Sequence, residues 1–140
     1  MKVLFLDIDG VLNNERTKEK FPEGLFKGCH ALDGRLTRLY LNWLKDKDIS
    51  VVLSSTWRLH DYLMEVLSAG GIHWLDVTPN MGHRGMEVAT WLAYSDATEY
   101  AILDDTQDFH SFQHAHFVQT SFIHGLRLKN LKRVEKILGL

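Results

Sequence analysis

Continuous apolar runs alternate with segments of helical periodicity along this chain. Residues 2–8 (KVLFLDI), 49–55 (ISVVLSS) and 99–105 (EYAILDD) are apolar runs bounded by polar residues, and residues 116–120 (HFVQT) are a weaker fourth. Such runs are typical of strands buried on both faces of a parallel sheet, whereas half-exposed strands alternate apolar and polar residues. We therefore expect four strands.

Four other segments repeat apolar residues at helical spacing. Asp33 can serve as the N-cap of the first, and Gly70 and Gly71 stop the second. The apolar positions are Leu36, Leu39, Tyr40, Trp43 and Leu44; Leu59, Tyr62, Leu63, Val66 and Leu67; Met86, Ala89, Leu92 and Ala93; and Leu131, Val134 and Leu138. Alternating strands and helices predict a three-layer α/β fold with a mostly parallel central sheet.

Length and composition narrow the class of protein. The 140 residues suit one domain with a proper core, and we predict a single domain over residues 1–140. The net charge of −2 argues against a broadly basic protein that coats nucleic acid, although it allows a local basic patch. Cys29 is the only cysteine, so the chain cannot form an internal disulfide, which favours a reducing compartment. No stretch approaches the roughly 18 apolar residues of a membrane span. We expect a cytoplasmic protein without a membrane partner.

Polar side chains gather at the ends of the predicted strands, where sheets of this kind bind ligands. These ends read Asp7-Ile8-Asp9-Gly10, Ser54-Ser55-Thr56-Trp57-Arg58 and Asp104-Asp105. Four carboxylates on two neighbouring strand ends repel one another unless a cation lies between them. Carboxylates and water suit Mg²⁺, which also binds phosphate oxygens. A carboxylate held beside a metal-bound phosphate can attack phosphorus and form an aspartyl-phosphate.

The same strand ends resemble the motifs of the haloacid dehalogenase (HAD) superfamily of phosphatases. Its D-x-D motif after a hydrophobic strand matches DIDGVLN, and its Ser or Thr at the next strand end matches Ser54 in VVLSSTWR. Its basic residue ahead of a helix matches Arg84 in HRGMEVATWL, where the family more often has Lys, and its paired acids match Asp104 and Asp105 in AILDD. The chain looks closest to the small HAD domains associated with RNA-repair and phage-like proteins. The resemblance implies a Rossmannoid, HAD-like domain.

The resemblance also implies roles for the four acids. Asp7 would be the nucleophile and a metal ligand. Asp9 would be the general acid for the leaving oxygen and then the base for the hydrolytic water, and its backbone carbonyl would reach the metal. Asp104 would bind Mg²⁺ directly, and Asp105 directly or through water. We expect the D-x-D strand at the centre of the sheet, with the strand that ends in Asp104 and Asp105 as its neighbour.

Phosphate contacts are implied at Ser54 and Arg84. Ser55 is the alternative to Ser54 if the register differs by one residue. Arg84 keeps the charge of the usual lysine on a planar fork. Arg58 directly follows a strand end and is a second candidate for binding phosphate or a substrate edge, with a structural salt bridge to the acidic cluster as the alternative. Trp57 is either a platform that stacks a base or a buried aromatic residue.

Other polar residues leave their roles open. Asp108 either lies near the metal or is the N-cap of the segment FHSF that follows it. His110, His114 and His116 have spacings that allow zinc binding, with ordinary surface or loop histidines as the alternative. A basic run near the C-terminus is either a solvated helix face or a track for a nucleic-acid backbone. It consists of Arg127, Lys129, Lys132, Arg133 and Lys136.

The spacing between the first motif and the next helix bears on the substrate. Only about twenty residues, 13–32, lie there, enough for a loop or hairpin but not for the cap domain that HAD enzymes insert at this point or after the third strand. We therefore expect an open site that suits a phosphate on a larger molecule. The predicted function is a Mg²⁺-dependent phosphomonoester hydrolase that acts on nucleotide or nucleic-acid terminal phosphates. The alternatives are a phosphatase of small metabolites and a non-catalytic or weakly catalytic binding module.

Overall fold

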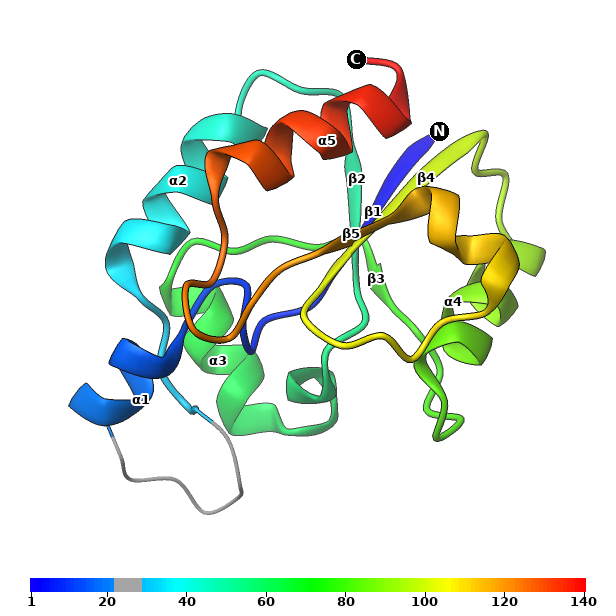
Figure 1. Ribbon diagram of the computed structural model, residues 1–140. Helices are drawn as coiled ribbons and strands as arrows, with labels where there is room; N and C mark the ends of the chain where they lie inside the picture. The colour runs from blue at the N-terminus through cyan, green and yellow to red at the C-terminus, as the bar shows by residue number, and fades with distance from the viewer. Residues whose placement is uncertain (22–28) are drawn as a thin grey trace.

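A single parallel sheet organises the protein. The computed structural model describes residues 1–21 and 29–140, and within them five parallel strands follow the order β3-β2-β1-β4-β5 (Figure 1). The strands are β1 (Lys2–Leu6), β2 (Ser50–Leu53), β3 (Asp76–Val77), β4 (Glu99–Asp104) and β5 (Phe117–Gln119). The predicted placement is confirmed, since β1 is central and pairs with β4 as well as β2.

Helices cover both faces of this sheet (Figure 1). They are α1 (Glu15–Lys20), α2 (Gly34–Leu44), α3 (Asp61–Ala69), α4 (Arg84–Ala93) and α5 (Leu128–Leu138), with 3₁₀ turns η1 (Thr56–Leu59) and η2 (Ser111–His116). In the described ranges, no helix has the length and apolar character that crossing a membrane requires. The three-layer α/β architecture predicted from the sequence is confirmed.

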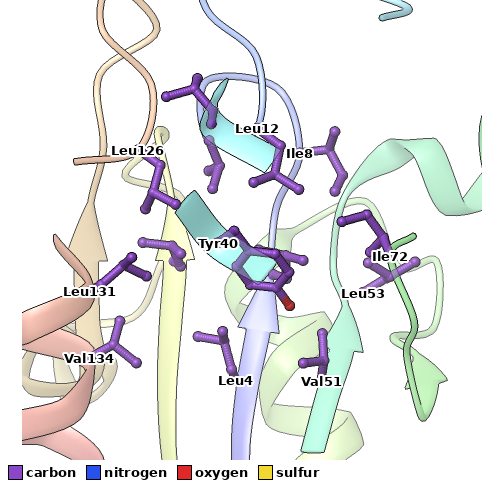
Figure 2. Close-up of a cluster of buried hydrophobic side chains, with 14 of the residues drawn as sticks. Leu4, Ile8, Leu12, Tyr40, Val51, Leu53, Ile72, Leu126, Leu131 and Val134 are labelled. Atoms are coloured by element: carbon purple, nitrogen blue, oxygen red, sulfur yellow. The ribbon is translucent and has the colours of Figure 1, made fainter. Parts of the chain in front are cut away.

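The side chains of β1 alternate between two hydrophobic clusters, one on each face of the sheet. Leu4 and Leu6 belong to the larger cluster, to which α2, α3 and α5 contribute (Figure 2). Val3 and Phe5 point to the other face, where they pack with residues of α4 such as Val88. Because β1 is buried on both faces, its sequence is a continuous apolar run.

The helix predictions hold best where the buried face is apolar. The Asp33 carboxylate accepts a hydrogen bond from the Leu36 backbone N–H at 2.9 Å and caps α2 as expected. In α5, the three predicted positions Leu131, Val134 and Leu138 are all fully buried. Both helices were predicted correctly because apolar residues make up most of their buried faces.

The predicted faces of α3 and α4 were partly wrong. Leu59 precedes α3 in the separate turn η1 and is 47% exposed. In α4, the expected Met86 is 44% exposed, while Gly85 and Glu87 point inward beside Val88. A glycine and a carboxylate on a buried face are invisible to a pattern of apolar residues, so the face was placed about one position away.

Two elements were not anticipated. Strand β3 has only two residues, Asp76 and Val77, too few for any periodicity. Helix α1 occupies part of residues 13–32, where we expected a loop or hairpin; Asn14 caps it by accepting from the Thr17 N–H at 3.1 Å. Residues 22–28 of this segment lie outside the described residues. Among the described residues, no cap domain interrupts the fold.

Candidate active site

Three carboxylates meet at the carboxyl ends of β1 and β4. The Asp7 backbone N–H donates to the Leu103 carbonyl at 3.0 Å, which places Asp7 beside Asp104. One oxygen each from Asp7, Asp104 and Asp105 lies within 4.8 Å of the others. The side chains of Asp7 and Asp104 are buried. Within residues 1–21 and 29–140, this is the one group of three or more His, Cys, Asp or Glu residues spaced to hold a metal ion.

Burial and mutual repulsion govern the protonation of this cluster. The pKa of Asp7 is raised well above its usual value because burial removes water and because Asp104 and Asp105 lie nearby, although Arg84 opposes the shift. Burial and Asp104 raise the pKa of Asp105 to about 6. Carboxylates forced together in this way favour a cation, and three oxygen ligands with room for water fit Mg²⁺.

Asp9 lies outside the three-carboxylate cluster and has its own partners. Its Oδ1 accepts hydrogen bonds from Asn13 Nδ2 at 3.0 Å and from Trp57 Nε1 at 3.1 Å. Burial raises the pKa of Asp9 even though both hydrogen bonds favour the ionised form. A carboxyl group that is oriented by two donors and holds its proton more tightly than usual is suited to act as a general acid.

Gly10, directly after the D-x-D motif, lets the two acidic strand ends approach each other. Its φ of +78° lies in the region that glycine adopts readily. A Cβ atom there would lie 2.3 Å from Asp105 Oδ2, far inside van der Waals contact. Any other residue at this position would push Asp105 away from Asp7.

Arg84 points from the first turn of α4 into the carboxylate cluster. Its Nη1 donates to Asp104 Oδ2 at 2.7 Å and to Asp7 Oδ1 at 3.3 Å. Burial alone would lower the pKa of Arg84, but the two carboxylates outweigh it and raise the pKa. Arg84 thus offsets one negative charge of the cluster. It lies next to Asp7, as expected for the phosphate contact that the sequence predicts for it.

Asp108 caps the helix that carries Arg84. Its Oδ2 accepts from the Arg84 backbone N–H at 3.0 Å, and its Oδ1 lies 3.0 Å from His83 Nε2. His83 in turn accepts from the Met86 N–H through Nδ1, which leaves Nε2 as the donor. Neither role considered for Asp108 is the one observed: it caps α4, whereas the N-cap of the turn η2 that follows it is His110.

Ser54 and Ser55 have opposite environments. Ser55 Oγ accepts from the Trp57 N–H at 3.1 Å and caps η1. Ser54 Oγ is buried and has no hydrogen-bond partner among the described residues. A buried hydroxyl without a partner is costly and uncommon, so it points to a ligand atom that completes it. This contrast supports Ser54 as the serine that contacts phosphate.

Arg58 requires a correction, because its side chain is fully used inside the protein. Four backbone carbonyls accept its hydrogen bonds, those of Ser54, Ser55, Thr78 and Pro79 at 2.8–3.2 Å. Its Nη2 also lies 3.0 Å from Glu87 Oε2. These contacts occupy all five N–H donors of the guanidinium. We therefore remove Arg58 from the phosphate-binding set: its role is structural, and its ion pair is with Glu87 and not with the acidic cluster that was the alternative from the sequence.

Trp57 also takes the structural alternative. Its side chain is 1% exposed, and its indole N–H is engaged by Asp9. A ring that is buried to this extent has no free face on which a base could stack. Trp57 instead orients the general-acid candidate.

Glu87 was missed by the sequence analysis. It is 4% exposed, and its Oε2 accepts from the Met81 N–H at 2.8 Å as well as pairing with Arg58. Its Oε1 lies 4.0 Å from Arg84 Nε. The spacing of Arg84 and Glu87 at i and i+3 was the available clue, since such pairs face each other on a helix.

The zinc alternative finds no support in the described part of the chain. His116 stacks on Tyr100 with ring centroids 3.9 Å apart, and its Nδ1 lies 2.9 Å from the Tyr100 carbonyl. His110 stacks instead on Phe112. The described residues place these histidines with His114 in no group spaced to hold a metal.

Comparison with known proteins agrees with this geometry. A family model described as the HAD domain in Swiss Army Knife RNA repair proteins matches residues 3–131. No curated protein and no solved structure matches the chain. The matched span contains every residue of the carboxylate cluster together with Asp9, Ser54 and Arg84. The chain therefore belongs to the family of HAD domains found in Swiss Army Knife RNA repair proteins.

Proposed function

We propose that this protein is a Mg²⁺-dependent phosphomonoester hydrolase that works through an aspartyl-phosphate on Asp7. One observation carries the proposal: the carboxylates of Asp7, Asp104 and Asp105 lie within 4.8 Å of one another, beside the unpartnered Ser54 hydroxyl and Arg84. HAD-family membership suggests activity of the phosphatase type. The arrangement offers a nucleophile, a place for a cation and donors for phosphoryl oxygens.

The metal would be held by the three clustered carboxylates, with the Asp9 backbone carbonyl as a further ligand. A bound Mg²⁺ would neutralise negative charge on the phosphoryl group and keep Asp7 and Asp105 ionised. The donor set fits this ion because all three side-chain ligands are carboxylate oxygens.

In the first step, an Asp7 carboxylate oxygen forms a bond to phosphorus. The bond between phosphorus and the ester oxygen breaks, and that oxygen leaves with the electron pair. The Asp9 carboxyl group, whose pKa burial raises, gives its proton to the leaving oxygen. The hydrogen bonds from Asn13 and Trp57 keep this carboxyl group oriented throughout.

In the second step, the ionised Asp9 accepts a proton from a water molecule that attacks phosphorus. The bond between phosphorus and the Asp7 oxygen breaks, which releases inorganic phosphate and restores the Asp7 carboxylate. Ser54 Oγ and Arg84 would donate hydrogen bonds to phosphoryl oxygens in both steps, where charge is greatest in the transition state.

The substrate we propose is the terminal phosphate of a nucleotide or nucleic acid. Two observations support it: the described residues include no cap that would enclose a small metabolite, and the matching family is described from RNA repair proteins. An open site gains little binding energy from a small sugar phosphate, whereas a polymer end brings its own contact surface.

The test compares wild-type protein with Asp7→Asn on an aryl phosphate, sugar phosphates and oligonucleotides that carry a 3′- or 5′-phosphate. We expect turnover that requires Mg²⁺, a phosphorylated Asp7 trapped by acid quenching and identified by mass spectrometry, and the highest kcat/KM on an oligonucleotide. Undiminished turnover in excess chelator would disprove the metal dependence. Sugar phosphates that lead by tenfold or more in kcat/KM would overturn the nucleic-acid substrate and leave only the phosphatase assignment.

A further inference from the structure

A polar hollow opens directly beside the carboxylate cluster. It has a volume of about 500 Å³, and it is lined by Asp105 and by residues between 119 and 130, which belong to the end of β5, the segment that connects β5 to α5, and the first turn of α5. Figure 1 shows this segment leaving the carboxyl end of β5 and passing near α1 before α5 begins. Gln119, Phe122, Arg127 and Lys129 are among its lining residues. The hollow therefore extends from the site at which the phosphate would react.

The wall of the hollow is fixed to the catalytic loops. The Thr120 N–H donates to the Asp104 carbonyl at 2.9 Å, and Thr120 Oγ1 donates to the Gly10 carbonyl at 2.6 Å. Gln119 Nε2 donates to the Asp105 carbonyl at 3.2 Å. The hollow and the carboxylates thus hold a set spacing, as a binding site for two parts of one substrate requires.

Gly125 shows how closely this wall packs. Its φ is +72°, and a Cβ atom there would lie 2.5 Å from Leu36 Cδ1 and 3.1 Å from the Asn13 carbonyl. Asn14 Nδ2 also donates to the His124 carbonyl at 3.0 Å. These contacts anchor the wall of the hollow to residues 13–14 and to α2, so its position is set by the fold.

The charge of the hollow favours an anion. Arg127 and Lys129 are exposed, and neither side chain has an ion pair or hydrogen bond with the described residues. Both stand at the start of α5, an 11-residue helix with no acid in its first turn. A helix N-terminus carries partial positive charge and normally disfavours cations there. An anion bound in the hollow would be attracted by both side chains and by the helix.

We propose that this hollow binds the internucleotide phosphodiester next to the terminal phosphate of a single-stranded nucleic acid, with Arg127 and Lys129 as the contacts to that phosphodiester. The inference rests on the proposed phosphatase function and makes it specific for a polymer end. A mononucleotide or an aryl phosphate has no second phosphate to place there. Phe122 in the lining offers an apolar contact for a sugar or base.

The experiment measures kcat/KM for a short phosphorylated oligonucleotide and for an aryl phosphate in Arg127→Ala/Lys129→Ala. We expect the ratio of the two values to fall by about tenfold, mainly through KM. Loss of the contacts to this one phosphodiester should also reduce the slope of log affinity against log salt by about 0.7 for a single strand. The matched control is Lys132→Ala/Arg133→Ala, which removes the same charge from exposed positions of α5 outside the lining.

Direct binding separates this inference from the proposed function. Fluorescence anisotropy with the same labelled oligonucleotide, in an Asp7→Asn background, reports affinity without turnover. If the wild type hydrolyses neither substrate, and of the two double variants only Arg127→Ala/Lys129→Ala loses affinity for the oligonucleotide, the phosphatase proposal fails and the binding site stands. Equal losses of affinity in both double variants would show non-specific electrostatic attraction to α5. Unchanged affinity in both would show that the oligonucleotide does not contact the hollow. Both results would overturn the inference.

Discussion

Two arginines at the carboxyl edge of the sheet, Arg58 in η1 and Arg84 at the start of α4, have opposite surroundings. Arg58 donates to four backbone carbonyls and pairs with Glu87. Arg84 faces two acidic side chains of the candidate site, Asp7 and Asp104. The side chain of Arg58 is 2% exposed, and that of Arg84 is 15% exposed. Arg58 is part of the scaffold, whereas Arg84 faces the candidate site.

The partners explain the difference. Backbone carbonyls are fixed by the fold, so a ligand that competed for Arg58 would leave several buried acceptors unsatisfied. In the proposed mechanism, a bound cation would give the carboxylates around Arg84 another counter-charge and free the guanidinium for a phosphoryl oxygen. Glu87 joins the two regions, since it pairs with Arg58 and lies 4.0 Å from Arg84 Nε. The structural arginine thereby helps to position the one that would contact substrate.

The largest effect should come from Asp7→Asn, which removes the nucleophile and a metal ligand. We expect turnover to fall to background, because a carboxamide is a poor nucleophile and a weaker ligand. Without metal, thermal unfolding should show stability that is unchanged or higher, since the neutral amide relieves repulsion within a buried cluster. Asp46→Asn, at an exposed position, is the control. Near-wild-type turnover in Asp7→Asn would mean that another group attacks phosphorus.

Arg58→Ala should lower the free energy of unfolding more than Arg84→Ala does. Removing one partner of a buried ion pair leaves the other uncompensated and typically costs about 3–5 kcal/mol. Urea unfolding should therefore show a large loss in the free energy of unfolding, while Arg35→Ala at an exposed position changes it by less than about 0.5 kcal/mol.

Arg58→Lys keeps the charge but loses the planar guanidinium, so its loss in the free energy of unfolding should lie between those of Arg58→Ala and Arg35→Ala. The variant should therefore remain folded for kinetic measurements. Activity per folded molecule should change little in this variant. Normal stability combined with a large rise in KM would instead return Arg58 to the phosphate site.

Arg84→Ala should act on catalysis more than on stability. We expect kcat/KM to fall by about 10²–10³, the usual loss when one donor to a developing anion is removed. With Mg²⁺ present, the free energy of unfolding should stay close to that of the wild type. Arg84→Lys, which introduces the residue that the family more often has at this position, should retain more of the rate than Arg84→Ala. A stability loss as large as that of Arg58→Ala would show that the contrast between the two arginines is wrong.

The arginines also show how far the sequence alone could lead. Buried apolar strands and the acids after them were sufficient to predict the parallel sheet and the gathering of acids at its carboxyl edge, which depend on hydrophobic pattern and general rules of topology. The central strand and its neighbour followed from the resemblance to HAD phosphatases. The two arginines, by contrast, are distinguished only by what surrounds them in three dimensions.

The contacts of Arg58 come from residues 54–55 and 78–87, which the fold brings together. No periodicity reports such a convergence of carbonyl groups. Glu87 was hidden for the same reason, because a buried carboxylate on a helix reads as a solvated position unless its partner is known. The unpartnered Ser54 hydroxyl likewise becomes visible only when neighbouring donors and acceptors have been placed.

The smallest expected effect is a pH-dependent change in stability that comes from the carboxylate cluster beside Arg84. In metal-free protein, the pKa of Asp105 is about 6 and that of Asp7 is raised, so the folded state binds protons more tightly than the unfolded chain. Stability contributed by this protonation is present below the ordinary aspartate pKa near 4 and is lost as pH rises through about 6. In chelator, the Tm should therefore fall between pH 5 and pH 7 by more in the wild type than in Asp105→Asn.

Mg²⁺ should reverse this trend, since it binds only the ionised carboxylates. A ligand at a hundred times its Kd stabilises the folded state by about 2.7 kcal/mol, so Mg²⁺ should raise the Tm clearly at pH 7 and much less at pH 5. Asp105→Asn should weaken that response, and Asp46→Asn should retain it. The response should be at least as large in Arg84→Ala, because the guanidinium no longer competes with the cation for Asp7 and Asp104. An equal effect of Mg²⁺ on the Tm at both pH values would show that the cation does not bind at these carboxylates.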